Sequence, residues 1–200
     1  VDELIPLTRA VVRGSTRAMV IADLPFGSYE SSPEQALVTA TRFFKEAGAM
    51  AVKLEGAHLA TVEKLANSGI PVMGHLGLTP QSLHQLGGYR VQGRTDGDVI
   101  FEAALALEKA GAFAIVLELV PAELAERITK ALSIPTIGIG AGLGCDAQVL
   151  VWTDMAGITA KPPKLAKAYR NLRQELLDAA SEFSAEVRTG TFPTEAQTFH

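Results

Sequence analysis

The sequence predicts an α/β protein that is built on parallel strands. Short apolar runs alternate with helical segments along the chain, and these runs lack the strict apolar–polar alternation of half-exposed strands. Continuous apolar strands are typical of parallel sheets that are covered on both faces. Polar residues gather where the runs end, as they do in a (β/α) barrel and also in a doubly wound open sheet. The pattern alone leaves these two architectures open.

Six apolar runs are predicted to be buried strands, and each carries few polar residues before its C-terminal end. They are residues 19–23, 49–55, 71–76, 112–119, 136–139 and 148–152.

Helix signals lie between these runs. Ser32 is a predicted N-cap, Pro33 suits the first helical position, Gln35 stands three residues after the cap, and Gly48 ends that helix. Further helices are predicted at residues 59–67, 98–110 and 121–132, and a long final helix around residues 164–187. The predicted order is therefore a repeated β-α unit.

An internal echo supports this repetition. Residues 45–51 resemble residues 108–114, and the same offset of 63 residues carries Glu55 onto Glu118. In two β-α units, the predicted strand thus has a carboxylate at the equivalent position near its C-terminal end.

Composition excludes several classes of protein. Two hundred residues with 48% hydrophobic and 20% charged content suit one large globular domain. A net charge of -4 gives no basic surface for nucleic acid, and no apolar stretch reaches the roughly 18 residues that a membrane span needs. The single cysteine, Cys145, excludes an internal disulfide and fits a reducing compartment. Because the chain opens on Val1, we expect its true N-terminus to be absent.

Charged and polar residues end four successive strands: Asp23, Glu55, His75 and Glu118. Lys53 shares a strand face with Glu55, because residues two apart in a strand point the same way. A single acid at a strand end is usually a turn residue. Together, however, these side chains predict a polar site at one rim of the sheet, because the strands otherwise reject charge.

Oxygen ligands without thiols favour a hard cation such as Mg²⁺, and we expect Asp23 and Glu55 to bind it. Lys53 either neutralises Glu55 or binds an anionic substrate. We give His75 a supporting role at the substrate, although a histidine in a loop is about as often a structural anchor. The glycine run at residues 138–142 lacks the dinucleotide and Walker spacings and predicts a tight βα turn.

The long loop at residues 75–94, HLGLTPQSLHQLGGYRVQGR, predicts a binding loop or lid. Together with ADLPF, VKLEG, VLELVP and IPTIGIGAG, it closely resembles the ketopantoate hydroxymethyltransferase family over nearly the whole chain. The resemblance implies a (β/α)8 TIM barrel, with residues 1–200 forming a single, N-terminally incomplete barrel domain. The first two strands, and a Gly-Asp-Ser motif that helps to bind metal and substrate, are missing. It also implies a cytoplasmic homodecamer.

The resemblance assigns roles to the strand-end residues. It implies Asp23 and Glu55 at Mg²⁺, Asp23 and Lys53 at the keto acid, and Glu118 as the base that removes a proton from carbon. The implied reaction moves a one-carbon unit from 5,10-methylenetetrahydrofolate to 3-methyl-2-oxobutanoate through a Mg-stabilised enolate. The folate contacts are not predicted. A related Mg-dependent lyase or aldolase barrel, or a non-catalytic barrel that binds a keto acid, remains an alternative.

Overall fold

The computed structural model describes residues 1–200, which divide into two compact units, Val1–Val149 and Leu150–His200. The first unit contains the whole sheet. The expectation of a single barrel domain stays a prediction. No helix in either unit combines the length and the apolar character that crossing a membrane requires.

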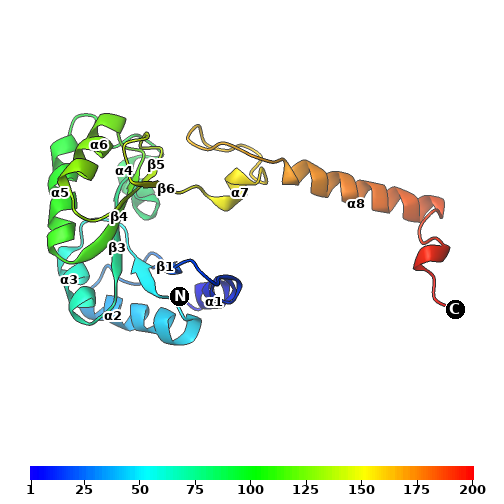
Figure 1. Cartoon of the computed structure of the whole chain (residues 1–200), viewed down its shortest axis with the longest axis horizontal. Coiled ribbons are helices and arrows are strands. Elements are labelled where there is room, and N and C mark those ends of the chain that lie inside the picture. Colours follow the sequence, from blue (N-terminus) through cyan, green and yellow to red (C-terminus); the bar gives the residue numbers. More distant parts are fainter. The chain divides into compact units, whose positions relative to one another are not determined.

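The first unit is built on one open sheet of six parallel strands in consecutive order, which forms a half-barrel (Figure 1). The strands are β1 (Ile21–Asp23), β2 (Ala51–Lys53), β3 (Val72–Gly77), β4 (Ala112–Glu118), β5 (Thr136–Ile139) and β6 (Ala147–Gln148). Because all strands run the same way, their C-terminal ends meet at one edge of the sheet. The prediction of parallel β-α units is confirmed.

One helix precedes the first strand, and the other helices of this unit lie in the connections between strands. The helices of the first unit are α1 (Leu4–Gly14), α2 (Pro33–Arg42), α3 (Leu59–Asn67), α4 (Leu83–Leu86), α5 (Gly97–Lys109) and α6 (Ala122–Ala131). Figure 1 shows α3, α5 and α6 along the outer side of the sheet. This placement follows from the right-handed crossover that joins successive parallel strands.

Local sequence explains where α2 begins and ends. The Ser32 side chain accepts a hydrogen bond from the Gln35 backbone N–H at 3.1 Å, and Pro33 occupies the first turn. The helix continues as a π-helical turn over Phe43–Ala47 and stops at Gly48, whose φ is 79°. Glycine adopts this left-handed conformation without a Cβ clash, so the predicted stop signal is confirmed.

The two faces of the sheet differ in character because neighbouring residues in a strand point to opposite faces. Leu54 and Leu117 are fully buried in the core beneath the helices, where they join Leu65 of α3 and Leu107 of α5. Burying each leucine contributes about 1.5–3 kcal/mol. The other face carries polar side chains near the strand ends, among them the register partners Asp23 and Lys53.

Some element boundaries differ from the predicted ones. The predicted strand at 148–152 is wrong beyond Gln148, because residues Trp152–Met155 form helix α7 after a cap at Val151. The helix predicted from about residue 164 begins only at Leu172, as α8 (Leu172–Thr189). Its start is delayed because the backbone N–H of Tyr169 donates to the Met155 carbonyl and the Asn171 side chain caps the helix. Helix α1 was not predicted.

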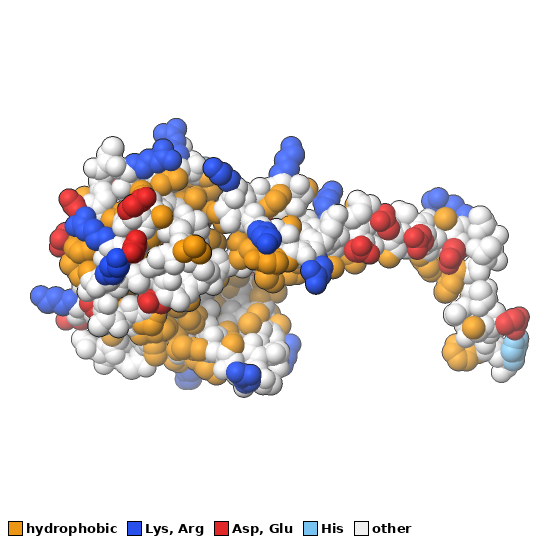
Figure 2. Space-filling model, turned by 45° about the horizontal axis from the view of Figure 1, so that its top comes forward, with side chains coloured by type: hydrophobic (Ala, Val, Ile, Leu, Met, Phe, Trp, Pro, Cys, Tyr) orange, Lys and Arg blue, Asp and Glu red, His pale blue; other side chains and the backbone are white.

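The second unit consists of α7, α8 and the short 3-10 helix Glu195–Gln197. Its helix α8 ends at Gly190, which has a φ of 71°. Large apolar side chains of α8, including Leu176 and Phe183, are exposed, and Figure 2 shows hydrophobic and charged side chains together on this helix.

A carboxylate joins α5 to the segment before β5. Glu108 accepts hydrogen bonds from the Ser133 backbone N–H at 2.7 Å, the Ser133 hydroxyl at 2.6 Å and the Ile134 backbone N–H at 3.2 Å. These bonds lower the pKa of Glu108. Since the folded-state pKa is depressed, the stabilisation is present at neutral pH and is lost as the pH falls through the carboxyl range near 4.

Substituting Glu108→Ala is therefore expected to lower the free energy of unfolding by about 1 kcal/mol at neutral pH and by less at acidic pH. Urea unfolding at several pH values measures this difference. Glu102→Ala, on the exposed face of the same helix, is the control and should change stability little. An equal loss in both variants at every pH would contradict the role of Glu108.

Candidate functional site

An ion pair joins the ends of the first two strands. Asp23 of β1 and Lys53 of β2 are register partners, and the Lys53 Nζ lies 2.8 Å from the Asp23 Oδ1. The Lys53 side chain is 18% exposed and the Asp23 side chain 53% exposed. The ammonium group is thus held below the rim while the carboxylate faces solvent.

His75 of β3 continues this line of charges across the sheet. Its Nδ1 lies 3.4 Å from the Lys53 Nζ. An ammonium group can only donate, so this contact is a hydrogen bond in the tautomer whose Nδ1 accepts and whose ring proton is on Nε2. The Nε2 atom lies 3.2 Å from the Glu118 Oε2, but its alignment does not make a hydrogen bond and leaves this buried atom without a partner.

Glu55 is the most enclosed carboxylate of the site, with a side chain that is 5% exposed. Its Oε2 accepts a hydrogen bond from the Gln81 backbone N–H at 2.8 Å, and its Oε1 lies 3.8 Å from the His75 Nδ1. Burial raises the pKa of Glu55, and the bond from Gln81 offsets part of that effect. Glu55 therefore has one oxygen engaged and one without a hydrogen-bond partner.

The backbone sets the position of Glu118 at the end of β4. Its register partner is Gly77, which has a φ of 91° and packs so closely that an added Cβ would lie 2.1 Å from the Glu118 carbonyl oxygen. The next residue, Leu119, has a φ of 46°, a left-handed conformation that costs a leucine about 1–3 kcal/mol. The Leu119 carbonyl in turn accepts a hydrogen bond from the Gln92 N–H at 2.9 Å.

The carboxylates of the site are the kind of ligand that magnesium binds, but there are too few of them to hold the ion alone. Asp23 and Glu55 offer carboxylate oxygens only, which Mg²⁺ prefers, and it commonly uses one or two protein carboxylates with water and substrate oxygens. The structure contains no group of three or more His, Cys, Asp or Glu side chains placed to hold a metal. Asp23 and Glu55 therefore make up only part of a ligand set for magnesium, and their role as metal ligands stays a prediction.

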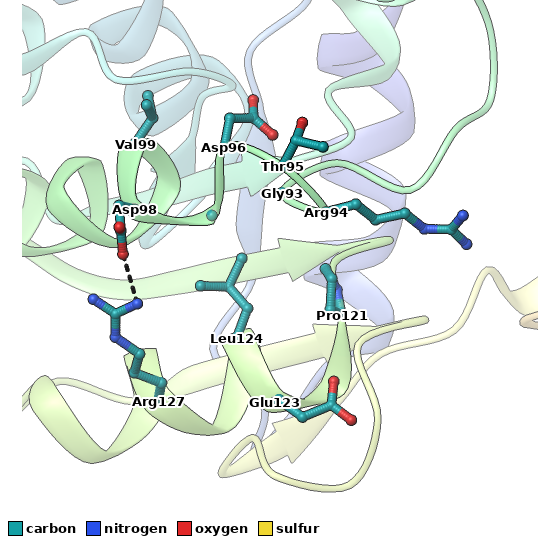
Figure 3. A pocket seen from close by; sticks show the side chains of 11 residues that line it. Gly93, Arg94, Thr95, Asp96, Asp98, Val99, Pro121, Glu123, Leu124 and Arg127 are labelled. Carbon is teal, nitrogen blue, oxygen red and sulfur yellow. Dashed lines mark hydrogen bonds and ion pairs between the residues drawn. The ribbon is translucent and has the colours of Figure 1, made fainter.

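The pocket in Figure 3 contains none of these site residues. It measures about 680 Å³ and lies between the N-terminal ends of α5 and α6. An ion pair between Arg127 Nη1 and Asp98 Oδ1, at 2.6 Å, spans one end, and the Arg94 side chain extends away from the others. Acidic and basic side chains are mixed in its lining, so its charge favours no particular ligand.

The structure brings together all five residues that the sequence singled out, on the non-helical face at the C-terminal ends of the strands. They are Asp23, Lys53, Glu55, His75 and Glu118.

Two residues that contact Glu55 were missed, Tyr29 and Gln81. Both lie in loops that follow strands rather than at the strand ends. The only signal for Gln81 was its place in the long loop after β3.

Sequence comparison with known proteins identifies the family to which this chain is similar. The family model described as ketopantoate hydroxymethyltransferase matches residues 1–195. Relatives named 3-methyl-2-oxobutanoate hydroxymethyltransferase include those of Frankia casuarinae, 62% identical over 97% of this chain, and Frankia alni, 64% identical over 97%. That of Acidothermus cellulolyticus is 61% identical over 100%. This chain spans 67%, 65% and 75% of their respective lengths.

Solved structures of similar fold include phosphonopyruvate hydrolase, with a TM-score of 0.53 and 15% sequence identity. The match covers 98% of this chain and 70% of that one. The same enzyme in complex with oxalate and Mg++ gives a TM-score of 0.52 at 17% identity, with the same coverage. At this level of identity the likeness concerns the fold alone.

Proposed function

Because this chain belongs to the ketopantoate hydroxymethyltransferase family, we propose that it transfers a hydroxymethyl group to 3-methyl-2-oxobutanoate. The product would be 2-dehydropantoate, with 5,10-methylenetetrahydrofolate as the one-carbon donor. The observation that carries the proposal is the row of neighbouring polar groups from Asp23 through Lys53 and His75 to Glu118, each within 3.4 Å of the next. It offers one cation, one hydrogen-bond donor and one free carboxylate to a small acidic substrate.

Lys53 would bind the anionic keto acid. Its ammonium group is held by Asp23 on one side and lies beside His75 on the other, so its position is fixed before the substrate arrives. A fixed charge in a partly buried place loses little conformational entropy on binding. Asp23 would contact the same substrate from the exposed side of the pair.

Asp23 and Glu55 would hold Mg²⁺, with the unpartnered Oε1 of Glu55 as one ligand. When bound, the ion would supply a Lewis acid for the keto group. Phosphonopyruvate hydrolase, a protein of similar fold, was crystallised with oxalate and Mg++, a metal together with a small acid.

Glu118 would act as the general base. Its carboxylate would take the proton from C3 of the keto acid, and the Nε2–H of His75, 3.2 Å from Oε2, would orient it. The electron pair left on C3 then forms the new bond to the methylene carbon of the folate. Water supplies the hydroxyl group of the product, and both bonds between the methylene carbon and the folate nitrogens break. The proton taken by Glu118 and the second proton of the water end on those two nitrogens, so tetrahydrofolate is released.

The wider assembly is part of the same proposal. Two further strands would close the six-stranded half-barrel into a (β/α)8 barrel, and the resemblance implies a cytoplasmic homodecamer. The consecutive parallel order of β1 to β6 supports the barrel, because an eight-stranded barrel continues that order around a circle.

Magnesium dependence tests this proposal. The full-length protein, which includes the N-terminal strands that the resemblance implies, is expected to form 2-dehydropantoate from keto acid and 5,10-methylenetetrahydrofolate in the presence of Mg²⁺. Removal of the metal by a chelator should abolish turnover. Adding Mg²⁺ back should restore it, whereas a thiol-preferring metal should do so poorly. Mass spectrometry of the product provides the measurement. Full activity after exhaustive chelation would contradict the metal site, and turnover of the keto acid without folate would favour the lyase or aldolase alternative.

A further inference from the structure

A buried tyrosine hydroxyl links three loops at the site. Tyr29 follows β1, is 2% exposed, and its ring meets the His58 ring edge-on at 5.6 Å. Its hydroxyl lies 2.7 Å from the Gln81 Oε1 and 3.2 Å from the Glu55 backbone nitrogen. Three segments, after β1, after β2 and after β3, therefore converge on this one oxygen.

The Tyr29 hydroxyl has a partner both as a hydrogen-bond donor and as an acceptor. A phenol has one proton to donate, and the shorter contact places it on the Gln81 Oε1. The oxygen accepts from the Glu55 backbone N–H, while the Glu55 carbonyl lies farther away at 3.4 Å. Burial raises the pKa of Tyr29, so the phenol stays neutral and keeps its donor.

The side chain of Gln81 is held at both ends. Its Oε1 accepts from Tyr29, and its Nε2 donates to the Leu24 carbonyl at 2.8 Å. An amide group fixed in this way restrains its own backbone. The Gln81 backbone N–H is the group that donates to the Glu55 Oε2 at 2.8 Å. The orientation of the Glu55 carboxylate is thus tied, through Gln81, to the tyrosine hydroxyl.

We propose that Tyr29 is a positioning residue. It holds Gln81 in place, the Gln81 backbone N–H then binds the Oε2 of Glu55, and the Oε1 of Glu55 remains available to bind the cation. The inference deepens the proposed function, on which it rests for the presence of that cation. Groups that orient a metal ligand from behind typically change metal affinity about 10–100-fold when they are removed.

Substituting Tyr29→Phe isolates the hydroxyl, because it keeps the ring and its contact with His58. We expect two changes in the full chain. Hydrogen exchange of the Gln81 amide should accelerate about 10-fold or more, and the dissociation constant for Mn²⁺, a paramagnetic substitute for Mg²⁺, should rise about 10-fold. Lost turnover should return at saturating Mg²⁺, a rescue that a general loss of structure would not allow.

Tyr169→Phe is the matched control. Tyr169 lies outside the site and its loops, is 57% exposed, and its hydroxyl makes no hydrogen bond, so the substitution should affect neither measurement. Gln81→Met is a second variant for the case that Tyr29→Phe does not fold. It keeps the length of the side chain and the backbone N–H, but it removes both amide bonds, and it should reproduce both changes.

The outcomes separate this inference from the function it rests on. If the Gln81 amide keeps its protection in Tyr29→Phe, or loses it while Mn²⁺ binding stays unchanged, the positioning role is wrong. The product assay of the parent protein is read independently. Absence of 2-dehydropantoate would reject the proposed function, whereas the exchange and Mn²⁺ measurements would still decide whether the hydroxyl orients Glu55.

Discussion

Glu118→Gln is expected to slow exchange of the C3 proton of 3-methyl-2-oxobutanoate with solvent by roughly 10²-fold or more, the usual scale of general-base catalysis. The amide keeps the size of the side chain and its place beside the His75 Nε2, but it cannot accept the proton. Binding of the keto acid should survive, because the two proposed binding residues, Lys53 and Asp23, are unchanged. Proton exchange followed by NMR at saturating keto acid and Mg²⁺, without folate, isolates this step from the one-carbon transfer.

Glu102→Gln provides the control for this measurement, since Glu102 lies exposed on α5 and makes no side-chain hydrogen bond. If Glu118 were only a structural carboxylate, Glu118→Gln would lose stability or metal affinity while its saturated exchange rate stayed near that of the parent. A well-folded variant with an unchanged rate would identify another base. His75 is the next candidate, because its Nε2 lies 3.2 Å from the Glu118 Oε2.

Gly77→Ala is expected to lower the free energy of unfolding by about 3 kcal/mol or more. The new Cβ would lie 2.1 Å from the Glu118 carbonyl oxygen and 2.7 Å from the Val120 Cγ1, and the φ of 91° is itself strained for alanine. Overpacking costs about 1–3 kcal/mol and a disfavoured backbone conformation about as much. Relief of the clash must also move the Glu118 backbone, so proton exchange should fall with stability. Urea unfolding and the exchange assay measure the two effects.

Gly69→Ala separates the two costs. Gly69 has a φ of 80°, but a Cβ there would meet no atom within 4 Å, so the variant has the conformational cost without the clash. We expect a loss of about 1–2 kcal/mol and unchanged proton exchange. If Gly77→Ala were no more harmful than Gly69→Ala, the close approach of β3 to the Glu118 backbone would not constrain the site.

The positions of the polar side chains at the strand ends could be predicted from the sequence, because they depend on short-range rules. Successive residues of a strand point to opposite faces of the sheet, and the C-terminal ends of parallel strands meet at one edge. These two rules alone assign Lys53 and Glu118 to the same rim. The sequence similarity between residues 45–51 and 108–114 predicted that Glu55 and Glu118 occupy equivalent positions in two β-α units. Helix α3 was predicted with its observed bounds, Leu59–Asn67.

Contacts that depend on loops could not be predicted in this way. Tyr29 and Gln81 are 52 residues apart and meet only because the loops after β1 and β3 fold over the end of β2. No periodicity encodes such a meeting. Helix α8 began late for a related reason, because backbone hydrogen bonds to Met155 and Ala156 replaced the local helical bonds at residues 169–172. Tertiary hydrogen bonds override local preference in both cases.

The line of contacts from Asp23 to Glu118 determines how substitutions in this site combine. Each member touches the next, at 2.8 Å, 3.4 Å and 3.2 Å, so removal of one leaves its neighbour with a changed charge or a lost partner. Residues in one such network show interaction energies of about 0.5–3 kcal/mol in double-mutant cycles. The free-energy effects of single substitutions at Asp23, Lys53, His75 and Glu118 are therefore expected not to be additive. A single-substitution result would not measure the independent contribution of any one of these side chains.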